Sequence, residues 1–249
     1  MKQIIPGRMT PKNLLAIVCM LCTISSCTVL KTGKDRVVPD LRVQLKVNSL
    51  HAKKIQEQGL LGTDAGDEPS LVYTINGYDE KGNLLSVNNG FWGTRTIQQD
   101  ALILAEEFSN LTVNIPTNGK VIAAFSLVEI DDYKGERKIA KIKPFTKSER
   151  YPKFLSISSF DEDRNMPPME FIAKSLKVAG YKNFITKHMN VSINDDLGGT
   201  IQVLDTEDVK KLVEGAKSGK ETYEMDGSQI NENYLYILKY GLSVSRNKN

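Results

Sequence analysis

The sequence predicts an α+β protein, in which an antiparallel β-sandwich is followed by a smaller α/β region with two helices and a long C-terminal strand. Three patterns support this fold class. Short segments of alternating apolar and polar residues, separated by turn residues, recur through residues 41–148. Apolar residues then return twice at helical spacing in residues 149–249, and a last alternating segment covers residues 234–244. The second half is either a separate domain or completes the sandwich.

The first half holds the candidate strands of the sandwich. Segment 41–47 alternates strictly, as a half-buried strand does, and segment 120–130 is almost continuously apolar, as expected of a central strand. Glycine and asparagine in residues 79–83 predict a hairpin turn. Residues 51–69 predict a long polar loop, whereas residues 97–108 fit a helix and a strand equally well. The predicted strands cover residues 41–47, 70–78, 84–87, 111–115, 120–130 and 137–142.

The second half changes to a helical period. The prolines at 167–168 open a predicted helix over 169–179, and Gly180 ends it. Thr206 is the predicted N-cap of a second helix, which ends at Gly219. The predicted strands of this half cover residues 154–158, 200–204 and 234–244.

The N-terminus has the three parts of a signal peptide over residues 1–26. A basic segment precedes an apolar run at 14–22, which is about half of the ~20 residues that a spanning helix needs. The junction Ile24-Ser25-Ser26-Cys27 resembles the bacterial lipobox. That resemblance implies cleavage before Cys27 and lipid on its thiol and amine. The alternative is an ordinary secretory signal with an incidental cysteine.

The same resemblance implies a location. Cleavage would remove Cys19 and Cys22, so Cys27 would be the sole cysteine of the mature chain. Residues 27–40 are polar and predict a tether between lipid and domain. Two or more acyl chains hold a protein stably at a membrane. Thr28 follows the cysteine in place of Asp, which in lipoproteins of this kind favours the outer membrane, with the domain facing the periplasm.

Charge argues against a nucleic-acid partner. The chain has 33 basic and 30 acidic residues, and three of the bases, Lys2, Arg8 and Lys12, lie in the predicted signal peptide, which contains no acid. The mature chain would therefore be formally neutral. A neutral chain lacks the broad basic surface that nucleic-acid binding requires.

Acidic loops offer weak candidates for calcium, and no other cofactor is expected. Asp131 and Asp132, and a second group of Asp64, Asp67 and Glu68, could chelate calcium at one end of a sandwich, although a role as turn residues is the favoured account. Residues 161–165 begin like an EF-hand loop, but Met166 and Ile172 stand where that loop needs Gly and Glu. We interpret residues 161–165 as a polar loop that caps the following helix.

Nothing in the sequence marks a catalytic site. His51 and His188 are the only histidines, and neither lies in a zinc-binding pattern. No nucleophile elbow is present, so a hydrolase is the least favoured interpretation.

Aromatic residues are the best candidates for binding a partner or a glycan. Phe91 and Trp92 lie between two glycines, where a loop could present them, although packing in the core explains them equally well or better. One face of the last strand carries three tyrosines, which would pack against the sheet or be exposed at an edge. They are Tyr234, Tyr236 and Tyr240.

These patterns predict a lipid-anchored, non-enzymatic accessory or structural protein that binds another envelope protein. The combination of a lipobox and a sandwich resembles the β-sandwich lipoproteins that brace secretion assemblies at the outer membrane, such as the type VI secretion lipoprotein. The alternative is a glycan- or calcium-binding lipoprotein that uses its sandwich loops.

Overall fold

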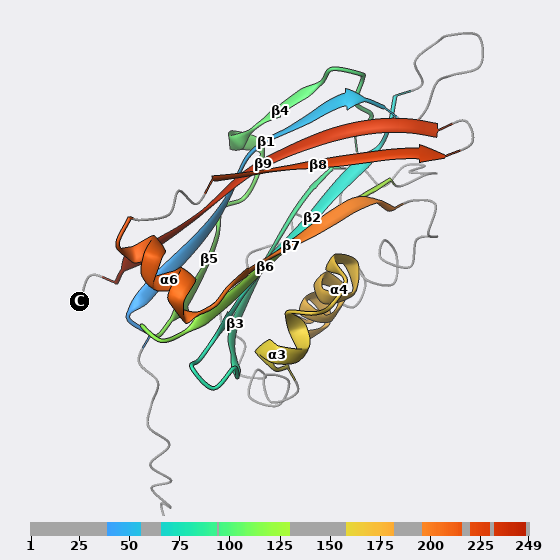
Figure 1. Ribbon diagram of the computed structural model, residues 1–249. Coiled ribbons are helices and arrows are strands. Elements are labelled where there is room, and N and C mark those ends of the chain that lie inside the picture. The colour runs from blue at the N-terminus through green and yellow to red at the C-terminus, as the bar shows by residue number, and fades with distance from the viewer. Residues whose placement is uncertain are drawn as a thin grey trace, which may run out of the picture. The chain divides into compact units, whose positions relative to one another are not determined.

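Two antiparallel sheets pack face to face in the computed structural model (Figure 1), which confirms the α+β sandwich. The structure describes residues 39–55, 66–93, 95–129, 158–181, 196–215, 220–229 and 232–247. The strands are β1 (Leu41–Lys54), β2 (Pro69–Tyr78), β3 (Leu84–Gly93), β4 (Leu102–Leu104), β5 (Leu111–Ile115), β6 (Lys120–Glu129), β7 (Asp196–Leu204), β8 (Lys220–Gln229) and β9 (Glu232–Arg246). The helices are the 3-10 helix η1 (Ala105–Glu107) and the α-helices α3 (Phe160–Asp163), α4 (Pro168–Val178) and α6 (Thr206–Val213).

The strands from both halves of the chain build both sheets. One sheet has the order β4-β1-β9-β8, and β5 also pairs with β1 beyond β4. The other has the order β3-β2-β6-β7. Because β9 pairs with β1 over most of its length and β7 pairs with β6, the C-terminal strands complete the sandwich that the first half begins.

The predicted loop over residues 51–69 is wrong at its start, because β1 continues to Lys54. The pairing of β1 with β9 shifts register after Val47 and again after Ala52. Each irregularity breaks the strict alternation that a strand shows in sequence. Leu50 and Ala52 are nevertheless fully buried, so this part of β1 belongs to the core.

Several other elements differ from the prediction, and β7 begins at Asp196 rather than at residue 200. Strand β3 extends to Gly93, and β8 was not expected from its polar sequence. Asp205, not Thr206, caps α6: its backbone is extended and its carboxylate accepts a hydrogen bond of 2.9 Å from the N–H of Asp208. Helix α6 ends at Val213 rather than near Gly219, and Gly215 follows with a positive φ of 71°.

The core has two layers. Between the sheets, Tyr73 of β2 stacks near Phe125 of β6, and Phe125 in turn contacts Tyr240 of β9, with ring centroids 6.1 and 4.4 Å apart. The other face of the four-stranded sheet is covered by α3 and α4 (Figure 1). Helix α4 buries Phe171, Ile172 and Leu176 against that face, the spacing expected for one apolar side of a helix.

Three buried tyrosines predict an alkaline limit to stability. Burial raises the pKa of Tyr73 to about 12. It also raises the pKa of Tyr78 and of Tyr236, which the neighbouring carboxylates Asp163 and Asp67 raise further. Above pH ~10 the unfolded tyrosines lose their protons and the folded ones keep them, so the stabilisation is complete below pH ~10 and is lost as pH rises. Each of the three tyrosines should lower the free energy of unfolding by about 1.4 kcal/mol for every pH unit above pH ~10, until its own folded-state pKa is reached.

Urea unfolding at pH 9, 10 and 11 measures this slope. Tyr73→Phe provides the control, because it removes one of the three titrating groups and should reduce the slope by about one third. A free energy of unfolding that does not change between pH 9 and 11 would contradict the assignment.

Candidate functional site

Several predicted site residues lie outside the described part of the chain. These are the lipidation candidate Cys27, the calcium candidates Asp64, Asp131 and Asp132, and His188. The predicted strand at 137–142 and most of that at 154–158 lie outside it as well. Among the described residues no helix is long and apolar enough to span a membrane.

Trp92 is a core residue of β3 and not a loop anchor. Its side chain is 6% exposed and packs against Phe108 between the sheets. The indole Nε1 donates a 3.1 Å hydrogen bond to Glu107, and the guanidinium of Arg95 lies over the ring at 5.4 Å. Burial would raise the pKa of Glu107, but hydrogen bonds from Trp92 and Arg95 and the charge of Arg95 hold it below its usual value. The hydrogen bond between Trp92 and Glu107 therefore holds β3 against η1.

Phe91 precedes Trp92 in β3, so its side chain points to the opposite face of the sheet, toward the helices. It is half-buried and packs against the cluster beneath α4. Neither Phe91 nor Trp92 lies in a loop, because β3 continues through both and pairs with β2. The pair therefore lies in a strand with Trp92 in the core, which agrees with the prediction of core packing and not with presentation by a loop.

The tyrosine face of β9 is also buried. Tyr234, Tyr236 and Tyr240 all lie in the core between the sheets. The hydroxyl of Tyr236 donates a hydrogen bond to the carboxylate of Asp67, which precedes β2. These tyrosines therefore stabilise the packing of the two sheets and do not form an exposed binding surface.

The acidic residues that resembled metal ligands have structural roles where they are described. Residues 161–165 were expected to be a loop, but Asp163 ends helix α3 and is fully buried. It accepts hydrogen bonds from Tyr78 (2.6 Å), Ser158 (2.7 Å) and Lys174 (2.6 Å). Over the described residues, no group of three or more His, Cys, Asp or Glu side chains could hold a metal ion.

A groove opens on the side of the sandwich where β3 faces β5. Both are edge strands, of the four-stranded and the five-stranded sheet respectively. Hydrogen bonds join the two sheets at three points along this side: Trp92 to Glu107, Tyr73 to the carbonyl of Ser109, and Asn88 to the carbonyl of Thr112. Beyond Asn88 the strands separate and leave a cavity of about 360 Å³.

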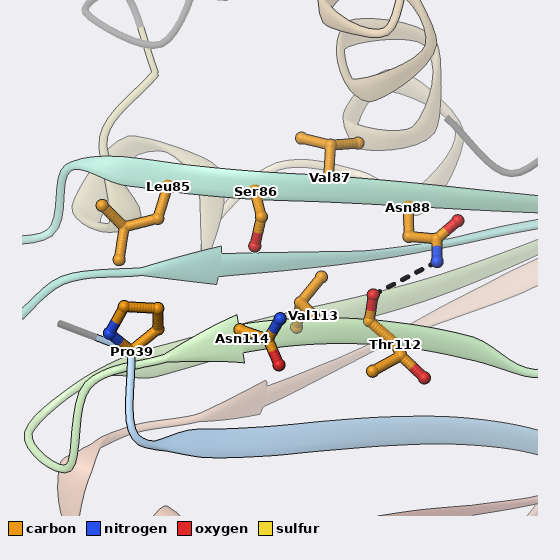
Figure 2. Close-up of a pocket in the computed structure, with 8 residues that line it drawn as sticks. All are labelled: Pro39, Leu85, Ser86, Val87, Asn88, Thr112, Val113 and Asn114. Carbon is orange, nitrogen blue, oxygen red and sulfur yellow. Dashed lines mark hydrogen bonds between the residues drawn. The ribbon is translucent and has the colours of Figure 1, made fainter. Parts of the chain in front are cut away.

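Eight residues line this groove, and none of them carries a charge. Figure 2 shows Leu85 and Ser86 of β3 pointing toward β5, while Val87 points the other way, toward α4. The lining residues are Pro39, Leu85, Ser86, Val87, Asn88, Thr112, Val113 and Asn114. Pro39, the first residue that the structure describes, is one of the lining residues (Figure 2).

Two polar atoms in the groove lack partners. The Oγ of Ser86 and the Oδ1 of Asn88 are buried and have no hydrogen-bond partner in the part of the chain that the structure describes. A buried polar atom without a partner costs about 1–3 kcal/mol, so such atoms normally bind water or a ligand. The groove is therefore a place where an added group would gain hydrogen bonds.

The sequence contained a signal for this site that the strand patterns did not use. The ten residues of β3 and the five of β5 contain no charged residue and no proline. Natural proteins usually protect edge strands with charges or prolines, because an exposed edge pairs with other chains. Recognising the signal required knowing that both strands lie at sheet edges and face each other, which local patterns do not reveal.

Comparisons with known proteins do not assign a family. No protein-family model matches the chain, and no curated protein matches it. Among solved structures, the chain is similar to a C2 domain, the one designated A, of a plant extended synaptotagmin 1. That likeness covers 85% of this chain and 99% of the plant domain, with 9% sequence identity and a TM-score of 0.33. It is too distant to carry an argument about function.

Proposed function

We propose that this protein is a lipid-anchored, non-enzymatic envelope protein that binds another envelope protein through the groove between β3 and β5. The observation that carries the proposal is the uncharged groove between two unprotected sheet edges. Trp92 and the three tyrosines of β9 were candidates for binding, but their burial makes them inaccessible to a partner.

The anchor supports this location for a binding site. Cys27 lies 12 residues before Pro39, which lines the groove. Such a segment spans at most about 40 Å when fully extended. A lipid on Cys27 would therefore keep the groove within reach of proteins of the same membrane. The lipobox resemblance of residues 24–27 supports the anchor itself.

Lipidation is tested by metabolic labelling with a palmitate analogue in bacterial cells. We expect Cys27→Ala to abolish labelling completely, because the thiol is the attachment point. Cys22→Ala is the matched control: it changes a neighbouring cysteine of the predicted signal peptide and should leave labelling intact. Persistent labelling of the Cys27→Ala protein would overturn the anchor.

Partner binding is tested by a photo-crosslinking amino acid placed at Asn114 in the groove. We expect one discrete crosslinked product in the bacterium that makes the protein. The same amino acid at Glu224, which is exposed on β8 of the five-stranded sheet, should not give that product. A protein that yields no product at Asn114 and remains a monomer in mild detergent would contradict the proposed function.

A further inference from the structure

We propose that the groove binds one extended, uncharged segment of a partner polypeptide, which pairs as an added strand with the open edge of β5 and packs beside β3. This inference rests on the proposed function and specifies how its site recognises a partner. It depends on three features of the described residues: the direction of the β5 backbone, the neutral lining of the groove and the contrast with the other edge of the same sheet.

The open edge of β5 presents backbone groups to the groove. Strand β5 pairs with β1 on one side, with Val43 opposite Val113. The carbonyl of Thr112 accepts a 3.2 Å hydrogen bond from the Asn88 side chain of β3, so it points away from β1 (Figure 2). Since backbone groups alternate in direction along an antiparallel strand, the N–H and carbonyl of Asn114 point to the same open side. The carbonyl of Thr112 is already bound to Asn88, so the N–H groups of Thr112 and Asn114 and the carbonyl of Asn114 form the beginning of a ladder.

The lining selects a neutral occupant. None of the eight lining side chains is charged, so none could pair with a charge that binding would bury. Burying an unpaired charge is strongly unfavourable. The partnerless Oγ of Ser86 and Oδ1 of Asn88 favour a segment with small polar side chains, such as Ser or Thr, at the positions that face β3.

The opposite edge of the five-stranded sheet, strand β8, is protected against pairing with another chain by charged residues. Strand β8 carries four charged residues in ten, namely Lys220, Glu221, Glu224 and Asp226. Strand β5, at the opposite edge, carries none in five. Charges on an edge strand oppose pairing with another chain. The sequence therefore blocks strand addition at β8 and leaves β5 open to it.

The probe is the uncharged peptide acetyl-Thr-Val-Thr-Val-Thr-amide, added to the full-length protein in detergent micelles at millimolar concentration. Backbone hydrogen exchange of the protein is measured with and without it. We expect exchange of the Thr112 and Asn114 amides to slow by at least about tenfold, because both would donate or be enclosed within the new ladder. A peptide with proline in place of both valines cannot form that ladder and should leave exchange unchanged.

A matched pair of variants separates strand addition from a change in folding. Asn114→Lys places a charge on the open edge and should abolish the protection by the peptide. Ser243→Lys places the same charge on an exposed position of the central strand β9 and should retain it. Both should keep the unfolding midpoint of the wild type, followed by the fluorescence of Trp92. Equal protection in the Asn114→Lys protein would overturn the proposal.

The outcome also distinguishes this proposal from the proposed function. If crosslinking at Asn114 finds a partner but the peptide slows no β5 amide, the partner docks through side chains, and strand addition is wrong while binding stands. Protection at β4 instead, where Leu102 and Leu104 are 54% and 47% exposed, would overturn the assignment of strand addition to β5. If neither crosslinking nor exchange finds binding, both proposals fail.

Discussion

Asp163→Ala is expected to lower the free energy of unfolding by about 3–5 kcal/mol. The Asp163 carboxylate is fully buried between α3, α4 and β2. It accepts hydrogen bonds from the hydroxyls of Tyr78 and Ser158, and its other oxygen is 2.6 Å from the ammonium of Lys174. Removing it leaves two buried hydroxyls and a three-quarters buried ammonium without their acceptor. Urea unfolding followed by Trp92 fluorescence measures the loss.

Glu162→Ala is the matched control for this substitution. Glu162 is the neighbouring acid on α3, and its side chain is 67% exposed and 3.9 Å from the same Lys174 ammonium. An exposed ion pair of that length contributes little, so we expect a change below about 0.5 kcal/mol. If the two variants unfold at similar urea concentrations, the buried Asp163 network does not hold the helices to the sheet.

Asp163 also shows why local sequence patterns miss some structural roles. Residues 161–165 contain four acidic or amide side chains in a charged loop-like stretch, which normally indicates solvent exposure. The burial of one of them depends on Tyr78, 85 residues earlier, and on Lys174 from the next helix. Only the tertiary fold brings these groups together, so no spacing rule within the loop could identify the buried acid.

The strands that could be predicted best are those whose apolar and polar residues alternate regularly or whose residues are almost all apolar. Strand β5 alternates cleanly and β6 is an apolar run, and both were predicted within a residue of their observed ends. Strand β8 was missed because an edge strand with charges resembles a polar loop. The second part of β1 was missed because register shifts interrupt its alternation.

The candidate site was less predictable than the fold, for a related reason. The segments that hold Ser86 and Asn114 were both predicted as strands, but the groove exists only because β3 and β5 become edges of different sheets on the same side of the sandwich. Sequence patterns favoured aromatic residues as binding candidates instead, since aromatic side chains are common in binding sites. In this chain Trp92 and the β9 tyrosines stabilise the core between the sheets.

The role of Tyr236 as a core residue leads to the second large effect. We expect Tyr236→Ala to lower the free energy of unfolding by about 3–5 kcal/mol, because it removes a fully buried aromatic ring from between the sheets and leaves a cavity. It also removes the hydroxyl that donates to the buried carboxylate of Asp67. If Tyr236 instead formed a partner surface, the substitution would weaken binding at unchanged stability.

Tyr236→Phe separates packing from hydrogen bonding. It keeps the ring and removes only the hydroxyl, so Asp67 loses one donor while the core stays filled. We expect a loss of about 1–3 kcal/mol, smaller than that for the alanine variant. Urea unfolding of both variants, together with crosslinking from Asn114, gives the comparison. A destabilised alanine variant that still crosslinks when folded places Tyr236 in the core and the binding site in the groove. An alanine variant with wild-type stability and no crosslink would reverse that assignment.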